Sequence, residues 1–125
     1  MATEVKPTAT ANARRSSSFL QIAIAVQTLT IFLQAVSAGL LLTASYGETL
    51  HSAGARVMYG ASMLYVLAAV LAWKRGGGSR PIWHASGFLA LASVQVVLGI
   101  AHVPSAHLPL GVLMFGLSVL ALARR

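Results

Sequence analysis

Long apolar runs alternate with short polar stretches along this chain. Each of four runs is close to the 20 or so residues that an α-helix needs to cross the hydrocarbon core of a bilayer. The predicted spans cover about residues 19–44, 51–73, 82–101 and 107–123. Trp73 closes the second run and Trp83 opens the third, as expected for aromatic side chains at a membrane interface. The pattern predicts an all-α integral membrane protein.

The connections between the runs are short, which makes sequential helices antiparallel neighbours in an up-down-up-down four-helix bundle. The first and third helices begin on the same side of the membrane. We therefore expect two helical hairpins related by a pseudo-two-fold axis along the membrane normal. Residues 1–18 are rich in Ala, Thr and Ser and contain Pro7, so they are predicted to be a disordered tail before the membrane domain, residues 19–125.

Composition and charge agree with a chain whose solvent is the lipid bilayer. The chain is 57% hydrophobic and 9% charged, whereas soluble domains have about 25% charged residues. Its net charge is +7, and eight of its nine cations lie between or outside the apolar runs: Lys6, Arg14, Arg15, Lys74, Arg75, Arg80, Arg124 and Arg125. This placement sets membrane topology and does not indicate a nucleic-acid partner. We expect a protein of the cell (cytoplasmic) membrane with cytoplasmic N- and C-termini.

The residues that are missing exclude several kinds of chemistry. The sequence has no cysteine, so disulfides, thiolate metal sites and cysteine nucleophiles are excluded. Glu4 and Glu48 are its only acidic residues, which excludes catalysis by paired carboxylates. A small proton-coupled exporter would need a carboxylate inside the first helix, where there is none.

The second and fourth runs share a pattern that starts at a histidine. The second run has His51, then Ala55 at +4, Met58 at +7 and Ser62 at +11. The fourth run has His107, Gly111, Met114 and Ser118 at the same offsets. In an α-helix these offsets lie on the histidine's own face. The predicted symmetry brings the two histidines to equal depth in the outer leaflet, so the repeat predicts a paired ligand site.

Two neutral imidazoles on facing helices are suited to bind heme iron. Small residues at +4, Ala55 and Gly111, are expected to leave room for a porphyrin, as are the glycines at +9, Gly60 and Gly116. The two methionines are interpreted as core residues. Zinc would require three or four ligands. The sequence therefore favours heme b with His51 and His107 as its iron ligands.

Other polar residues lie near the predicted site. Arg56 is a cation within an apolar run and is expected to meet a heme propionate; the alternatives are that it snorkels to the interface or pairs with Glu48. His102 is five residues before His107. It is interpreted as a donor to the site, a proton carrier, a member of a small metal site or a competing ligand. His84, beside Trp83, is interpreted as interfacial.

Three short motifs resemble the heme A synthase family, whose members carry two such four-helix bundles in tandem. Glu48-Thr49-Leu50-His51 is similar to the Glu-x-x-His that opens the family's second helix. Gln95-Val96-Val97-Leu98-Gly99 resembles a Gln-x-x-Leu-Gly segment of a third helix, and His107 follows it at about the expected distance. The resemblance covers roughly residues 30–125. It implies His51 and His107 as axial heme ligands, with Glu48 as a polar residue beside the heme.

The chain departs from that family in several places. It has one bundle instead of two and no loop cysteines, Ser52 stands where an arginine is frequent, and His102 stands where a Thr-Val pair is usual. A heme-modifying reaction would therefore require a homodimer or a partner. We do not expect the chain alone to be an enzyme.

The predicted function is that of a small membrane heme protein for electron transfer or heme handling, with a membrane redox or heme-pathway protein as its partner. An alternative hypothesis is a cofactor-free accessory subunit that docks a partner. In that case the contact would be the polar face of the first helix, formed by Gln27, Thr30, Gln34 and Ser37.

Overall fold

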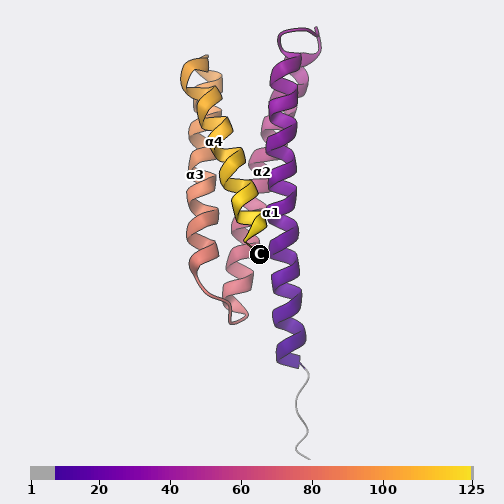
Figure 1. Ribbon diagram of the computed structural model, residues 1–125, viewed down its shortest axis with the longest axis vertical. Helices are drawn as coiled ribbons and strands as arrows, with labels where there is room; N and C mark the ends of the chain where they lie inside the picture. Colours follow the sequence, from indigo (N-terminus) through magenta and orange to yellow (C-terminus); the bar gives the residue numbers. More distant parts are fainter. Residues whose placement is uncertain (1–7, 125) are drawn as a thin grey trace, which may run out of the picture.

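The chain forms a bundle of four antiparallel helices. The computed structural model describes residues 8–124, which contain four helices and no strand. They are α1 (Thr8–Leu40), α2 (Gly47–Lys74), α3 (Arg80–Ile100) and α4 (Pro104–Ala123). Each helix is long and apolar enough to cross a membrane. Figure 1 shows sequential helices running in alternate directions, which confirms the predicted all-α, up-down-up-down bundle.

The four helices form a closed ring in which each packs against two neighbours. Both α2 and α4 contact α1 and α3, and α2 and α4 face each other across the diagonal. Helix α4 is tilted: it lies beside α3 near the loop that joins them and approaches α1 toward its other end (Figure 1). Phe32 of α1 and Phe115 of α4 touch there, with ring centroids 6.0 Å apart. The two hairpins, α1–α2 and α3–α4, therefore diverge above this contact.

Helix α1 begins at Thr8, eleven residues before the predicted start at Phe19. The part of it that is long and apolar enough to cross a membrane is Ser17–Leu40. The residues before it include alanines and two arginines, which are good helix formers. Extending an existing helix avoids the cost of a new nucleus, so residues 8–18 continue the spanning helix instead of forming a tail. Residues 1–7 of the predicted tail lie outside the described residues.

The helix ends near the α1–α2 loop also differ from the predicted ones. Helix α1 ends at Leu40, four residues before the expected Ala44, and α2 begins at Gly47, four residues before His51. The loop packs closely on itself, because a Cβ on Gly47 would overlap the carbonyl oxygen of Leu40. Only glycine fits there. As a result His51 lies one turn inside α2 and not at its first residue.

The core of the bundle has two apolar clusters with polar contacts between them. One cluster contains Leu20, Ala23, Ile24, Tyr65, Ala68, Ala69 and Ala85. The other contains Ile31, Met58, Phe88, Ala92 and Met114. Two hydrogen bonds of α1 lie between the clusters. Gln27 Nε2 donates to Ser62 Oγ of α2, and the hydroxyl of Thr28 bonds the hydroxyl of Ser118 of α4. Small residues let the helices approach closely, as is typical of membrane bundles.

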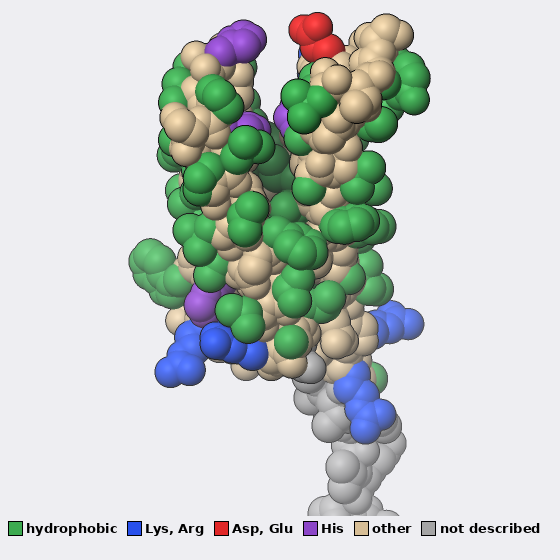
Figure 2. Space-filling view, turned by 45° about the horizontal axis from the view of Figure 1, so that its top comes forward, with side chains coloured by type: hydrophobic (Ala, Val, Ile, Leu, Met, Phe, Trp, Pro, Cys, Tyr) green, Lys and Arg blue, Asp and Glu red, His purple; other side chains and the backbone are tan. Residues whose placement is uncertain are grey.

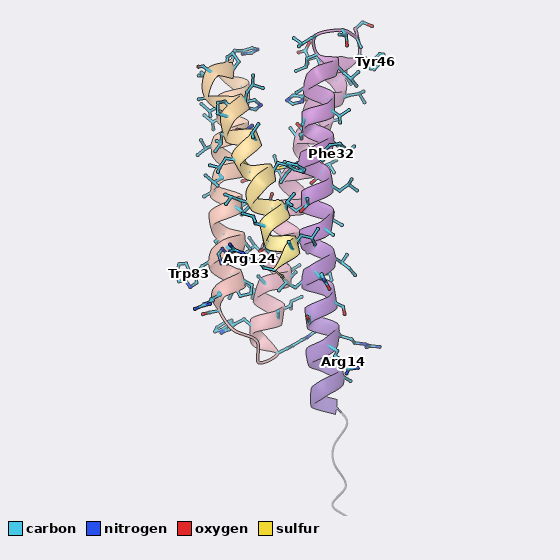
Figure 3. The ribbon with its side chains drawn as sticks, viewed as in Figure 1. Arg14, Phe32, Tyr46, Trp83 and Arg124 are labelled. Carbon is cyan, nitrogen blue, oxygen red and sulfur yellow. The ribbon has the colours of Figure 1, made fainter. Side chains whose placement is uncertain are left out.

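The two ends of the bundle differ in charge. We call the end with residues 75–79 the basic end and the end with residues 41–46 and 101–103 the histidine end. Figure 2 shows the visible Lys and Arg side chains at the basic end and an acidic side chain at the opposite end. Trp83 points outward from α3 near the basic end, and Tyr46 lies in the loop at the histidine end (Figure 3). Both aromatics are exposed at positions suited to membrane interfaces.

Candidate functional site

His51 of α2 and His107 of α4 face each other between the two hairpins. Their imidazole centroids are 6.2 Å apart, and the ring planes meet at 70°. Both side chains are partly buried. Figure 2 shows a hollow between the hairpins at the histidine end, with histidine side chains facing it from both sides. We call this hollow the groove and these two residues the histidine pair.

The ring of His107 is held by the main chain of α3. Its Nδ1 lies 3.0 Å from the carbonyl oxygen of Gln95. A carbonyl oxygen only accepts hydrogen bonds, so Nδ1 carries the hydrogen. In the neutral imidazole the lone pair is then on Nε2. His107 therefore has a free Nε2 lone pair for a ligand.

The ring of His51 is held by a hydroxyl group of α1. Ser37 Oγ lies 2.9 Å from His51 Nδ1 and 3.0 Å from the carbonyl oxygen of Gln34. A serine hydroxyl has one hydrogen, so it donates to only one of these two atoms. Both contacts form together when the hydroxyl donates to the Gln34 carbonyl oxygen and accepts from Nδ1 of His51. The Nε2 lone pair of His51 is therefore free as well, and the two rings carry the same tautomer.

Two glutamine side chains contact the main chain of the histidine pair. Gln34 Nε2 donates to the carbonyl oxygen of His51 at 3.3 Å, and Gln95 Nε2 donates to that of His107 at 2.8 Å. In the sequence, Gln34 belongs to a polar face and Gln95 to a short motif, and neither pattern predicts this role. The spacing hides it, because Gln34 precedes its histidine by 17 residues and Gln95 by 12.

The repeated pattern faces the bundle interior on both helices. Met58 and Met114 are buried in one apolar cluster, and Ser62 and Ser118 are buried below them. Ala55 and Gly111 are partly buried. The prediction for the glycines at +9 is wrong: Gly60 and Gly116 are exposed, since nine residues place them about half a turn away from the histidine. They leave no room beside the histidine pair.

The charged residues of the predicted site lie at its margin. Glu48 is exposed in the first turn of α2. Arg56 is exposed too, and five residues after His51 it lies about 140° around the helix axis. Its side chain therefore starts on the outer face of α2. This position agrees with the snorkelling alternative better than with a contact inside the groove.

His102 does not enter the groove. It is exposed in the turn after α3, with a φ of 53° and its Nδ1 2.9 Å from the carbonyl oxygen of Ile100. The amide of His102 bonds the carbonyl of Gly99, and the amide of Val103 bonds that of Leu98. These two bonds and the left-handed residue form a Schellman motif that ends α3. His84 is exposed near the basic end.

The polar face of α1 is used inside the bundle. Gln27 and Ser37 are 1% and 8% exposed and bond Ser62 and His51 of α2. Thr30 and Gln34 are partly buried, and Thr30 Oγ1 donates to the carbonyl of Gln27. A docking surface for another protein needs exposed groups. These contacts therefore do not favour the alternative of partner docking through this face.

The described residues offer two metal ligands at this site. No group of three or more His, Cys, Asp or Glu residues suited to a metal ion occurs within residues 8–124. A porphyrin supplies four nitrogen ligands of its own, so heme iron needs only two from the protein. Comparisons with protein-family models, with curated proteins and with solved structures found no match to this chain. The resemblance to the heme A synthase family thus rests on its motifs and stays a prediction.

Proposed function

We propose that this chain is a membrane heme protein in which Nε2 of His51 and Nε2 of His107 ligate the iron of one b-type heme. The observation that carries the proposal is the histidine pair itself: two imidazoles on different hairpins face each other with both Nε2 lone pairs free. The positions also coincide with the axial ligands that the resemblance to heme A synthases implies.

The separation of the rings fits one shared metal ion. A metal lies about 2 Å from the imidazole nitrogen that binds it, and the ring centre about 1 Å beyond, so rings on opposite sides of one ion have centroids about 6 Å apart. The centroids of the histidine pair are 6.2 Å apart. The Nδ1 hydrogen bonds hold both rings, which is the usual support for a ligating histidine.

The surroundings of the histidine pair suit a porphyrin. Seven residues after each histidine, on the same face of its helix, Met58 and Met114 are buried in one apolar cluster. Beside each ring the chain has a small residue, Ala55 or Gly111. A heme with two histidine ligands would supply one-electron transfer. The chain's own contribution is to bind and orient the iron and to keep its surroundings dry.

Orientation in the membrane follows from the charges. Six cations of the described chain lie next to the helix ends on the side of the basic end: Arg14, Arg15, Lys74, Arg75, Arg80 and Arg124. Cytoplasmic segments of membrane proteins are enriched in Lys and Arg. We therefore place both termini in the cytoplasm, the chain in the cytoplasmic membrane and the histidine pair in the outer leaflet. Electron transfer or heme handling there would involve a membrane redox or heme-pathway partner, and a heme-modifying reaction would require a dimer.

The test is an absorption spectrum of the purified protein, oxidised and then reduced with dithionite, together with a pyridine hemochrome assay. We expect a Soret band and a sharp reduced α band of the b type. His51→Ala and His107→Ala should each remove most of the heme. His84→Ala and His102→Ala are matched controls, since both histidines are exposed, and they should retain it. The proposal fails if the parent protein binds no heme, or if the control variants lose as much as the ligand variants.

A further inference from the structure

The two glutamines that touch the histidine pair make the same contact in each hairpin. Gln34 reaches from α1 to the carbonyl oxygen of His51 on α2, and Gln95 reaches from α3 to that of His107 on α4. In both cases the side-chain amide nitrogen donates to the main chain of the histidine. We call Gln34 and Gln95 the glutamine pair.

Helix formation does not require these contacts. In an α-helix a carbonyl oxygen accepts from the amide four residues later, and its second lone pair stays available. The glutamine amides take this second lone pair on both histidines. The contact therefore joins the two helices of a hairpin at the residue that carries the imidazole.

Glycines provide the space for these amides. A Cβ on Gly54 would overlap Gln34 Nε2, and a Cβ on Gly111 would lie 3.0 Å from Gln95 Nε2, closer than normal van der Waals contact. By contrast, a Cβ on Gly60 or Gly116 would meet nothing within 4 Å. In each hairpin a glycine thus leaves room for the glutamine amide, and a Cβ at that position would displace the amide from its present place.

Each histidine is consequently held at two points by the preceding helix. The glutamine pair fixes the main-chain carbonyls, while Ser37 Oγ and the Gln95 carbonyl oxygen fix the Nδ1 atoms. Two fixed points determine both the height of the residue along the hairpin and the rotation of its ring. The Oε1 atom of Gln95 is buried and has no hydrogen-bond partner among the described residues. That unpaired oxygen costs free energy, so the nitrogen contact is the one that explains a glutamine here.

We infer that Gln34 and Gln95 are positioning residues: they hold His51 and His107 so that both imidazoles face one ion in the groove. The inference rests on the proposed function for its ligand. The relative position of the two histidines, however, can be measured without heme. Removing either amide should leave the imidazole present but variable in position.

The experiment uses the absence of cysteine from the chain. Ser52→Cys and Leu108→Cys, at exposed positions beside the two histidines, accept a pair of nitroxide spin labels in the full-length protein. The tested variants are Gln34→Met and Gln95→Met, which keep the side-chain length but remove the donor, and Gly54→Ala and Gly111→Ala, which displace the amides. Gln21→Met, Gly60→Ala and Gly116→Ala alter exposed positions as matched controls.

In the protein without heme, we expect a broader distribution of label distances in the tested variants and an unchanged one in the controls. With heme, the electron paramagnetic resonance spectrum should gain a high-spin fraction, and heme affinity should fall about tenfold. Unchanged distances and an unchanged spin state in both methionine variants would overturn the inference. A parent protein that binds no heme overturns the proposed function instead, and the label distances alone then decide whether the glutamine pair positions the histidines.

Discussion

The hydroxyl of Ser37 lies between Nδ1 of His51 and the carbonyl oxygen of Gln34. When it donates to that carbonyl, its oxygen accepts from Nδ1 and leaves the Nε2 lone pair of His51 free for the iron of the proposed heme. In Ser37→Ala the ring loses this acceptor and rotates more freely. We expect the heme affinity to fall by about 10- to 100-fold, the usual effect of losing a partner of a ligating histidine. Titration of the heme-free protein with hemin measures it.

Ser52→Ala is the control for this prediction, because Ser52 neighbours His51 and is exposed. Its heme affinity should match that of the parent. An affinity in Ser37→Ala equal to that of Ser52→Ala would show that the hydroxyl does not support the ligand.

The sequence alone does not distinguish which of His102 and His107 faces His51, because the two lie close together in the chain. The two residues are separated by only four others around one short loop, and residue type does not distinguish them. The turn after α3 distinguishes them: His102 adopts the left-handed conformation that ends the helix, with a φ of 53°, and stays exposed. His107 then falls inside α4, on the face that turns toward α2.

The packing of α1 against α2 contains a polar group without a partner. Gln27 is 1% exposed, and its Oε1 accepts no hydrogen bond from the described residues, whereas its Nε2 reaches Ser62 at 3.4 Å. Ser62 Oγ donates to the carbonyl of Met58 and keeps that bond without Gln27. We therefore expect Gln27→Leu to raise the free energy of unfolding by about 1 kcal/mol, because it removes an unpaired buried oxygen.

Unfolding in mixed detergent measures this difference. Gln21→Leu, on an exposed part of α1, should change the free energy of unfolding little. If Gln27→Leu is less stable than the parent, Gln27 Oε1 has a partner such as a buried water molecule.

The periodicity of α1 predicted that its polar residues share one face, and they do. What it did not indicate is which surface that face meets, because the period of a helix carries no information about its neighbours. Ser37 reaches His51 and Gln27 reaches Ser62, both on α2. The repeats in α2 and α4 were more informative about helix neighbours. Two helices that carry the same stripe of residues are both expected to turn it toward the bundle interior.

In the molecule as a whole, the charges at the two ends predict its orientation. Reporter fusions that are active only in the cytoplasm should be active at both termini, and reporters that are active only outside the cytoplasm should be active when inserted in residues 41–46 or 101–103. Neutralising Lys74, Arg75 and Arg80 together should produce a mixture of orientations, because the positive charge of the middle loop is lost. Reporter activity in intact cells measures the fraction in each orientation.

Arg56→Gln provides the matched control. Arg56 lies in α2, outside the basic end, so its removal should leave the orientation unchanged. Active cytoplasmic reporters in residues 41–46 of the parent protein would contradict the predicted orientation and place the histidine pair at the inner leaflet.

Hydropathy and periodicity were enough to predict four spanning helices, their antiparallel order, and the stripes that α2 and α4 bury. These features depend on the free energy of apolar segments in lipid and on the 3.6-residue turn of the helix, both of which are local. The polar composition of residues 8–18 predicted a tail, whereas α1 begins at Thr8. Extending the spanning helix needs no new nucleus, so these residues join it in spite of their composition. The contacts around the histidine pair, the exposure of His102 and Arg56, and the groove depend on the distance and tilt between hairpins. Those quantities arise from packing between residues far apart in the chain, such as Gln95 with His107 or Phe32 with Phe115, and no local pattern contains them.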